Sequence, residues 1–214
     1  MTAAARKAQK IADLLAEVYP EAQCALQAGG DPWRLLVMAR LSAQCTDARV
    51  NLVCEDLFRE IPNVQAMANA PIEQIETLIR PCGLFRTKAE SIKNFSYIIA
   101  EEYGGRVPDT MEGLLALPGV GRKIANLILG DVYGKGGIVA DTHCIRICGR
   151  LGFYPEAQKD PVRTEKIMSP LLPAERQSDF CHRLVQFGRD TCTARAPQCG
   201  DCPLRGECTH GKNE

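Results

Sequence analysis

The sequence predicts an all-α protein, and three observations support that prediction. Apolar residues recur at helical spacing, as in the N-terminal run Ile11, Leu14, Leu15 and Val18, which is the pattern of one buried helix face. Runs of alternating β-branched residues, which would indicate strands, are not found. Of the 214 residues, 45% are hydrophobic, which is normal for a globular core. We therefore expect helices packed around one or two cores.

Helices are predicted in order along the first half of the chain. Residues 33–43 are apolar on nearly every face, which is typical of a helix inside a bundle, whereas residues 50–58 carry one apolar stripe. A third helix begins after Pro71 and ends at Gly83, where a glycine favours termination. Residues 89–99 repeat the apolar spacing and predict the next helix.

The second half continues the helical pattern. Asp109, with Glu112 three residues later, resembles a capping box that would open a helix running through Leu117. A glycine-rich loop is expected at residues 130–137. The Asp-Pro pair at 160–161 favours the start of a further helix. No alternation of β-branched residues interrupts this series.

The charge balance excludes a uniformly basic protein that holds nucleic acid by bulk attraction. The chain has 26 Lys+Arg and 26 Asp+Glu, so its formal net charge is +0. Any basic surface must therefore be local, and we expect it at five cations: Arg122, Lys123, Arg146, Arg195 and Arg205. No apolar run approaches the roughly 18 residues of a membrane span, and no signal-peptide core is present. We expect a soluble intracellular protein with no membrane attachment.

Eleven cysteines need an explanation, because an odd number in a chain without a secretion signal does not suit a disulfide framework. Seven are isolated, and we expect most of them to be small buried hydrophobes: Cys24, Cys45, Cys54, Cys82, Cys144, Cys148 and Cys181. The other four form a C-x6-C-x2-C-x5-C motif: Cys192, Cys199, Cys202 and Cys208. Four thiolates in one short loop fit either zinc or an iron–sulfur cluster.

A glycine turn predicts a helical hairpin. Pro118, Gly119, Val120 and Gly121 join two helical segments. Glycines let the backbone reverse sharply and approach another molecule closely, and the second helix begins with N–H groups directed out of the turn, which favours an anion such as phosphate. Val120 can pack inward and hold the turn. An ordinary αα-hairpin explains the same residues equally well.

Two titratable residues flank this region. Lys123 lies in the first helical turn, where the helix dipole and desolvation would both disfavour the ammonium form and favour a nucleophilic amine. A phosphate contact or a solvated charge is the alternative. Asp141 precedes Thr142-His143 where a loop enters a helix, so it suits an N-cap. Chemistry alone does not decide between these roles.

The order of the motifs adds a family resemblance. The segment 117–123, Leu-Pro-Gly-Val-Gly-Arg-Lys, resembles the helix-hairpin-helix of the DNA glycosylase superfamily that carries a Gly-Pro-Asp loop, and in particular its endonuclease III branch. The resemblance extends to residues 139–146, which contain Asp-Thr-His, to the cysteine motif, and to residues 41–47 upstream. It covers essentially residues 33–208.

The resemblance implies roles for individual residues. Lys123 matches the Schiff-base lysine of the bifunctional members, and Asp141 matches the aspartate that faces it across a cleft between two domains. Gln44 matches a residue that hydrogen-bonds the base left behind by a flipped nucleotide, and Leu84 matches a wedge between stacked pairs. The hairpin residues are expected to contact DNA together with His143: Gly119, Val120, Gly121 and Arg122. The four terminal cysteines are expected to hold a [4Fe-4S] cluster.

The resemblance also implies an architecture. We expect two helical domains with a DNA-binding cleft between them. Residues 26–135 would form a six-helix barrel with the hairpin, residues 136–214 a cluster domain, and residues 1–25 an N-terminal helix packed on the cluster domain.

The implied function is base excision repair. We expect a bifunctional DNA N-glycosylase that removes oxidised pyrimidines and cleaves 3′ to the abasic site by β-elimination. Its partner would be double-stranded DNA with damaged bases or abasic sites. It would act as a monomer in the cytoplasm of a bacterial-type cell, on the nucleoid. A monofunctional mismatch glycosylase is one alternative, and a non-catalytic DNA-structure binder or iron–sulfur redox sensor is another.

Overall fold

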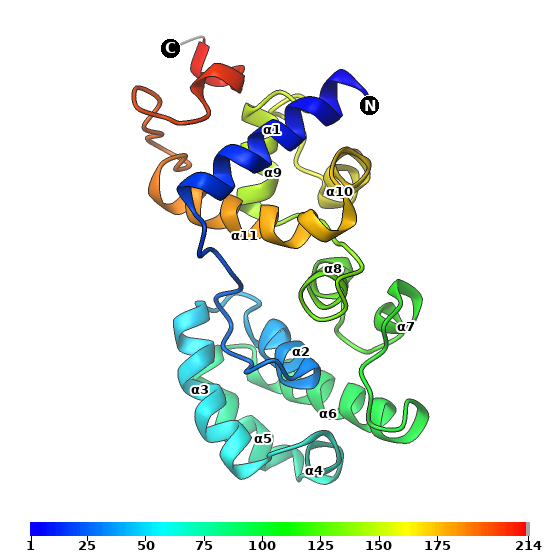
Figure 1. Ribbon diagram of the computed structural model, residues 1–214. Helices are drawn as coiled ribbons and strands as arrows, with labels where there is room; N and C mark the ends of the chain where they lie inside the picture. Colours follow the sequence, from blue (N-terminus) through cyan, green and yellow to red (C-terminus); the bar gives the residue numbers. More distant parts are fainter. Residues whose placement is uncertain (213–214) are drawn as a thin grey trace. The chain divides into compact units, whose positions relative to one another are not determined.

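The computed structural model describes residues 1–212, and over that range the protein is helical with no strand (Figure 1). The prediction of an all-α fold is confirmed. The chain divides into two compact units: residues 24–132 form one, and Met1–Gln23 with Tyr133–Glu214 form the other. We call the first the hairpin unit and the second the cluster unit, and each is described by itself. No helix of the described residues is long and apolar enough to cross a membrane.

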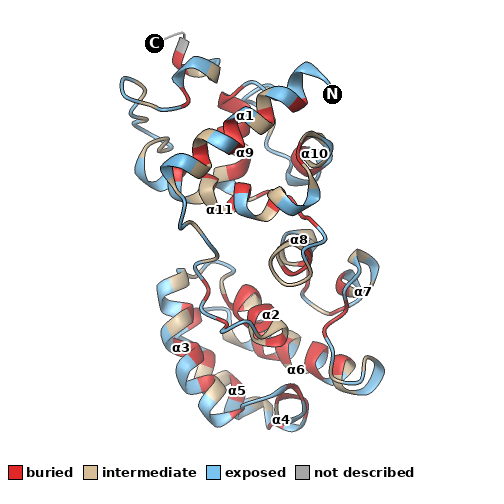
Figure 2. Ribbon diagram, viewed as in Figure 1, coloured by how far each residue is buried: buried red, intermediate tan, exposed pale blue. Residues whose placement is uncertain are grey.

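The hairpin unit is built around one buried helix. Its elements are α2 (Pro32–Leu41), α3 (Asp47–Glu60), α4 (Val64–Asn69), α5 (Ile72–Ile79), the 3-10 turn η1 (Arg80–Cys82), α6 (Phe85–Glu102), α7 (Met111–Leu115) and α8 (Arg122–Asp131). Helix α2 is buried on nearly every face, as its composition predicts, and Leu36, Val37 and Leu41 are fully inaccessible to solvent. Figure 2 shows buried positions along the whole of α2, whereas α3 keeps an exposed face.

The cluster unit joins the two ends of the chain. Its helices are α1 (Ala3–Val18), α9 (Thr142–Arg150), α10 (Pro161–Met168) and α11 (Ala174–Asp190), with 3-10 turns η2 (Ser169–Leu171), η3 (Arg205–Glu207) and η4 (His210–Lys212). Helix α1 packs on α11, because Ile11 and Leu15 share a core with Phe180 and Phe187. Beyond Asp190 the described chain has only the short turns η3 and η4. Other interactions must therefore hold that loop.

The start of α7 corrects one sequence expectation. Thr110, and not Asp109, is the N-cap, and its hydroxyl accepts a hydrogen bond from the N–H of Gly113. The N-cap therefore lies one residue later than expected, and Gly113, three residues after Thr110, has no side chain with which to complete a capping box. Threonine is itself a favoured N-cap, so two adjacent capping residues compete for one position. The helix start at the Asp-Pro pair 160–161 is confirmed, since Asp160 caps α10.

Candidate functional site

The turn between α7 and α8 needs glycine at one position for two reasons. Gly119 has a φ of 75°, and a Cβ built there would lie 2.7 Å from both Arg40 Nε and Ser91 Oγ. Val120 is buried and holds the turn on the core, as the sequence predicts. Gly121 is the N-cap of α8 and has no side-chain cap, and no atom lies within 4 Å of a Cβ built there. The start of α8 therefore suits the close approach of an anion.

Lys123 lies in the first turn of α8 and is exposed. The burial that sequence reasoning expected around this amine is not found, because Ala125 and Asn126 are the positions of this helix segment that turn toward the core. Arg122, the residue before it, is partly exposed. An exposed amine at a helix start is accessible to a substrate, which is the first requirement of a nucleophile.

Asp141 is the N-cap of α9 in the cluster unit. Its Oδ1 accepts a hydrogen bond of 2.7 Å from the N–H of Cys144. The capping role expected from the sequence is confirmed, and it occupies Oδ1 only. Because the cap fixes the side chain at the edge of the unit, where Asp141 is partly exposed, the carboxylate has a defined orientation. A preoriented negative charge of this kind can stabilise a developing cation.

His143 and Arg146 lie on the following turn of α9. Arg146 Nη2 is 3.2 Å from His143 Nδ1 and donates hydrogen bonds to the carbonyls of Gly188 and Cys192, at 3.2 and 2.8 Å. Sequence reasoning expected Arg146 at a DNA phosphate. In the structure its guanidinium holds the end of α11 and the start of the cysteine loop, and the phosphate contact stays a prediction.

The four terminal cysteines surround one cavity. Cys192, Cys199, Cys202 and Cys208 all line it, together with apolar side chains that include Leu151 and Phe187. Four thiols on the wall of one cavity are the donor set that iron–sulfur clusters use. The residues present therefore fit such a cluster. The surrounding apolar side chains would exclude water from the sulfurs on the inner side of the loop.

Arg150 is a residue that sequence reasoning missed. It is only 8% exposed, and its guanidinium donates hydrogen bonds to the carbonyls of Thr193 and Ala194 and to Cys192 Sγ, at 2.7, 3.1 and 3.3 Å. Its own carbonyl accepts from Thr209 Oγ1 at 2.8 Å. Arg150 thus ties both ends of the cysteine loop to α9. The sequence signal was weak, because a cation in the last turn of a helix usually stays in solvent.

Gln44 and Leu84 share an unusual backbone conformation. Their φ angles are 55° and 45°, and they are the non-glycine residues with positive φ in the described part of the chain. A left-handed conformation costs about 1–2 kcal/mol for a residue with a side chain. Both side chains are exposed, Leu84 at 58%. An exposed leucine in a strained conformation is not a core residue.

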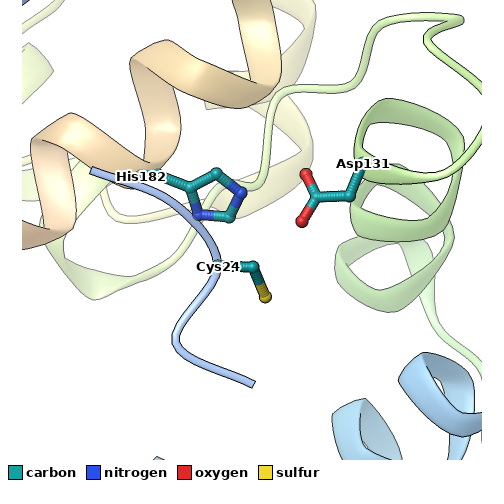
Figure 3. A group of neighbouring side chains, drawn as sticks. All are labelled: Cys24, Asp131 and His182. Atoms are coloured by element: carbon teal, nitrogen blue, oxygen red, sulfur yellow. The ribbon is translucent and has the colours of Figure 1, made fainter. Parts of the chain in front are cut away.

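A further pair of polar groups in the hairpin unit lies outside these motifs. Cys24 and Asp131 approach one another in Figure 3, close enough for the carboxylate to act on the thiol. Burial, reinforced by the Asp131 carboxylate, raises the pKa of the Cys24 thiol to about 12. This thiol stays protonated at neutral pH, so it is a poor nucleophile.

Comparison with known proteins agrees with this geometry. Residues 37–173 match the family described as HhH-GPD superfamily base excision DNA repair protein, and residues 192–208 match the iron–sulfur binding domain of endonuclease III. Endonuclease III of Bacillus subtilis (strain 168) is 40% identical over 201 residues, which are 94% of this chain and 90% of the relative.

Two solved structures show the same fold. A non-covalent endonuclease III–DNA complex matches with a TM-score of 0.89 and 37% identity, over 100% of this chain and 98% of the other. A trapped endonuclease III–DNA covalent intermediate, described as an estranged-adenine complex, has the same TM-score and identity, over 100% and 99%. At this level of identity the likeness extends beyond the fold to the family.

Proposed function

Because the chain belongs to the HhH-GPD superfamily of base excision DNA repair proteins, in its endonuclease III branch, we propose that Lys123 and Asp141 are the catalytic pair of a bifunctional glycosylase and abasic-site lyase. The observation that carries the proposal is the hairpin itself. An exposed lysine follows a helix start that has no side-chain cap, and the turn before it admits close approach of DNA. The substrate would be an oxidised pyrimidine in double-stranded DNA.

The chemistry follows from these two groups. The neutral amine of Lys123 attacks C1′ of the damaged nucleotide, the bond from C1′ to the base breaks, and the base leaves with the electron pair. The carboxylate of Asp141 stabilises the positive charge that develops on the sugar and assists proton transfer. The nitrogen then gives up a proton, the C1′–O4′ bond of the sugar opens with a proton going to O4′, and C1′ and the nitrogen form a protonated imine. This imine makes the 2′ proton acidic. Loss of that proton and of the 3′ phosphate breaks the strand, and water then releases the enzyme.

The residues around the pair would position the DNA. We propose that Gly119, Val120, Gly121 and Arg122 bind phosphate at the start of α8, and that His143 contacts the backbone near α9. Gln44 would hydrogen-bond the orphaned partner base and Leu84 would wedge between stacked pairs, since both side chains are exposed on short loops. We also propose the domain limits 1–25, 26–135 and 136–214 and a monomer that works on the nucleoid in the cytoplasm.

The iron–sulfur segment has a separate role. We propose that Cys192, Cys199, Cys202 and Cys208 hold the [4Fe-4S] cluster, whose contribution when bound is to cross-link a loop with little regular structure. The catalytic steps above need no electron transfer. With the loop fixed, Arg195 and Arg205 remain exposed on it and can meet phosphate.

Borohydride trapping tests the catalytic pair. Reduction of the imine should join the wild-type protein covalently to a duplex that contains thymine glycol, whereas Lys123→Ala should give no adduct. Lys159→Ala removes an exposed lysine elsewhere and should trap like the wild type. Asp141→Asn should bind the duplex but form the adduct at least about tenfold more slowly. Efficient trapping of Lys123→Ala, or base release without any adduct in the wild type, would contradict the proposal.

A further inference from the structure

Lys88 is a fully buried lysine that binds two separate segments of the hairpin unit. Its exposure is 0%, and it belongs to the first turn of α6. The ammonium donates hydrogen bonds of 2.8 Å to the carbonyl of Leu41 and of 2.8 Å to the carbonyl of Cys82. Leu41 is the last residue of α2, and Cys82 is the last residue of η1. The side chain therefore joins the C-terminal ends of two helical elements.

The chemistry of this position explains why a cation is there. Carbonyls at the end of a helix lack partners within the helix and lie at the negative end of its dipole. A buried ammonium satisfies both carbonyls at once, and they compensate part of its own desolvation. Burial lowers the pKa of Lys88, the nearby thiols of Cys82 and Cys45 act in the opposite direction, and Arg40 adds to the lowering. A purely apolar side chain would fill the space and leave two buried carbonyls without this donor.

The two segments that Lys88 joins lead directly into the strained residues. Gln44 follows Leu41 by three positions, and Leu84 follows Cys82 by two. The backbone N–H of Lys88 also donates to the carbonyl of Leu84, at 3.1 Å. A left-handed conformation at a residue with a side chain persists only when its surroundings hold it. The side chain of Lys88 supplies such a hold just before each of the two strained residues.

A second link brings the same two loops together. Burial, reinforced by the neighbouring Cys45 thiol, raises the pKa of the Cys82 thiol to about 11. The two thiols are therefore close together, and Cys45 is the residue after Gln44. The loops are thus neighbours within one unit, and their spacing is set by contacts beneath the exposed tips. A fixed spacing is what a hydrogen-bonding residue and a wedge would need in order to enter one stack of base pairs together.

We propose that Lys88 is a positioning residue for DNA opening, which sets the spacing and backbone conformation of Gln44 and Leu84 so that both enter the duplex when a nucleotide is flipped. This inference rests on the proposed roles of Gln44 and Leu84. Lys88 itself does not touch DNA, since its side chain is buried. Its effect should appear only with substrates that have stacked pairs to open.

The test compares one lyase reaction on two substrates. Lys88→Met keeps the length of the side chain and removes its donor. With an abasic site in duplex DNA, this variant should be slower by about tenfold, equivalent to about 1.4 kcal/mol. With the same abasic site in a single strand, which has no partner base and no stacked pair, the loss should stay below about twofold. An unchanged ratio of duplex to single-strand rates would overturn the proposal.

A matched control separates positioning from stability. Ser96 lies on the same helix, is fully buried, and accepts a hydrogen bond of 2.9 Å from the indole N–H of Trp33. Ser96→Ala also removes a buried polar contact, so it should lower stability while it leaves the ratio of rates at the wild-type value. If Ser96→Ala changes the ratio as much as Lys88→Met, the effect is general destabilisation and the proposal is wrong.

Two further variants keep the inference distinct from the proposed function. Leu84→Ala and Gln44→Ala should themselves lower the duplex rate selectively, and a failure there would refute the roles of the loop tips. If they behave as expected, Lys88→Met should be added to the double variant Leu84→Ala/Gln44→Ala. The triple variant should have a duplex rate less than about twofold below that of the double variant. A full tenfold additional loss would show that Lys88 acts elsewhere. Should Lys88→Met not fold, Lys88→Gln keeps a donor on a shorter stem and should lose about threefold on duplex DNA.

Discussion

The two units each use a buried cation to hold irregular backbone, but they use it differently. In the hairpin unit, the ammonium of Lys88 bonds one carbonyl at the end of each of two separate helical elements. In the cluster unit, the guanidinium of Arg150 collects two successive carbonyls and a thiol from a single loop. The compact ammonium joins two separate segments of the chain, whereas the planar guanidinium forms several hydrogen bonds to one continuous segment.

The loops of the two units differ in how far protein contacts alone can hold them, without a cofactor. The loops of the hairpin unit are short and lie between helices, so one buried side chain suffices to fix them. The cysteine loop runs for about twenty residues with only 3-10 turns, and a loop of that length does not order itself. Arg146 and Arg150 fix its beginning, and the iron–sulfur cluster must fix the rest. The following predictions test this division.

The largest effect should come from removing one ligand of the cluster loop. Cys199→Ala should lower the free energy of unfolding by more than about 3 kcal/mol, because loss of a metal site belongs to the most severe class of substitution. Iron content per chain and urea unfolding measure it. Cys54→Ala removes a buried thiol of the hairpin unit and should leave the iron content unchanged. Full iron occupancy in Cys199→Ala would contradict the statement that the cluster is needed to hold the cysteine loop.

The hairpin turn should be the most sensitive backbone position of the hairpin unit. Gly119→Ala should cost about 2–3 kcal/mol, because the positive φ and the approach to Arg40 and Ser91 both oppose a Cβ. Gly121→Ala, where nothing lies near a Cβ, should cost less than about 1 kcal/mol. Chemical denaturation compares the two. Equal costs would mean that the turn is not held as described.

Arg150→Met tests how much the guanidinium stabilises the cysteine loop. We expect a loss of about 2 kcal/mol in unfolding free energy, since the carbonyls of Thr193 and Ala194 lose a charged donor, together with a lower iron content. Arg205 offers the control, because it is exposed and donates to the carbonyls of Cys199 and Gly200 on the surface of the same loop. Arg205→Met should cost less than about 0.5 kcal/mol. A stable, iron-replete Arg150→Met would leave the cluster as the main hold on the loop.

The smallest expected effect concerns the buried thiol of Cys54, which has no proposed role in catalysis or in binding the cluster. Burial, with a smaller contribution from Cys82, raises the pKa of Cys54 to about 12. The unfolded thiol ionises near pH 9 and the folded one does not, so its contribution to stability is present below pH 9 and is lost as pH rises toward 12.

This sign gives a measurable difference between variants. The stability advantage of the wild type over Cys54→Ala should shrink by about 1 kcal/mol between pH 7.5 and pH 10 in urea unfolding. The advantage over Ser96→Ala, which removes no ionising group, should stay constant over the same range. A constant advantage over Cys54→Ala would show that this thiol ionises in the folded protein.

Much of this organisation is visible in the sequence, because it depends on local chemistry. The apolar faces of α2, the glycine turn at 118–121, the cap at Asp141 and the spacing of the terminal cysteines each follow from residue types at short separations. The displaced cap at Thr110 is a small error of the same local kind.

The remaining features depend on contacts between distant segments. Nothing local distinguishes Lys88 or Arg150 from the other cations, and burial of a cation is decided by the carbonyls that other elements bring to it. Positive φ at Gln44 and Leu84 likewise goes against residue preference, so only the folded surroundings can impose it. Sequence reasoning therefore proposed Gln44 and Leu84 but missed the buried contacts of Lys88 beneath them.

The packing of α1 on α11 has a consequence for synthesis of the chain. The core of the cluster unit includes Ile11 and Leu15 together with Phe180 and Phe187, so α1 emerges from the ribosome long before its partners. The hairpin unit is continuous and can fold in that interval. At roughly 5–20 residues per second, the apolar face of α1 waits on the order of ten seconds for α11. During that time the apolar face of α1 has no partner to bury it, so it is exposed to aggregation while the protein is being made.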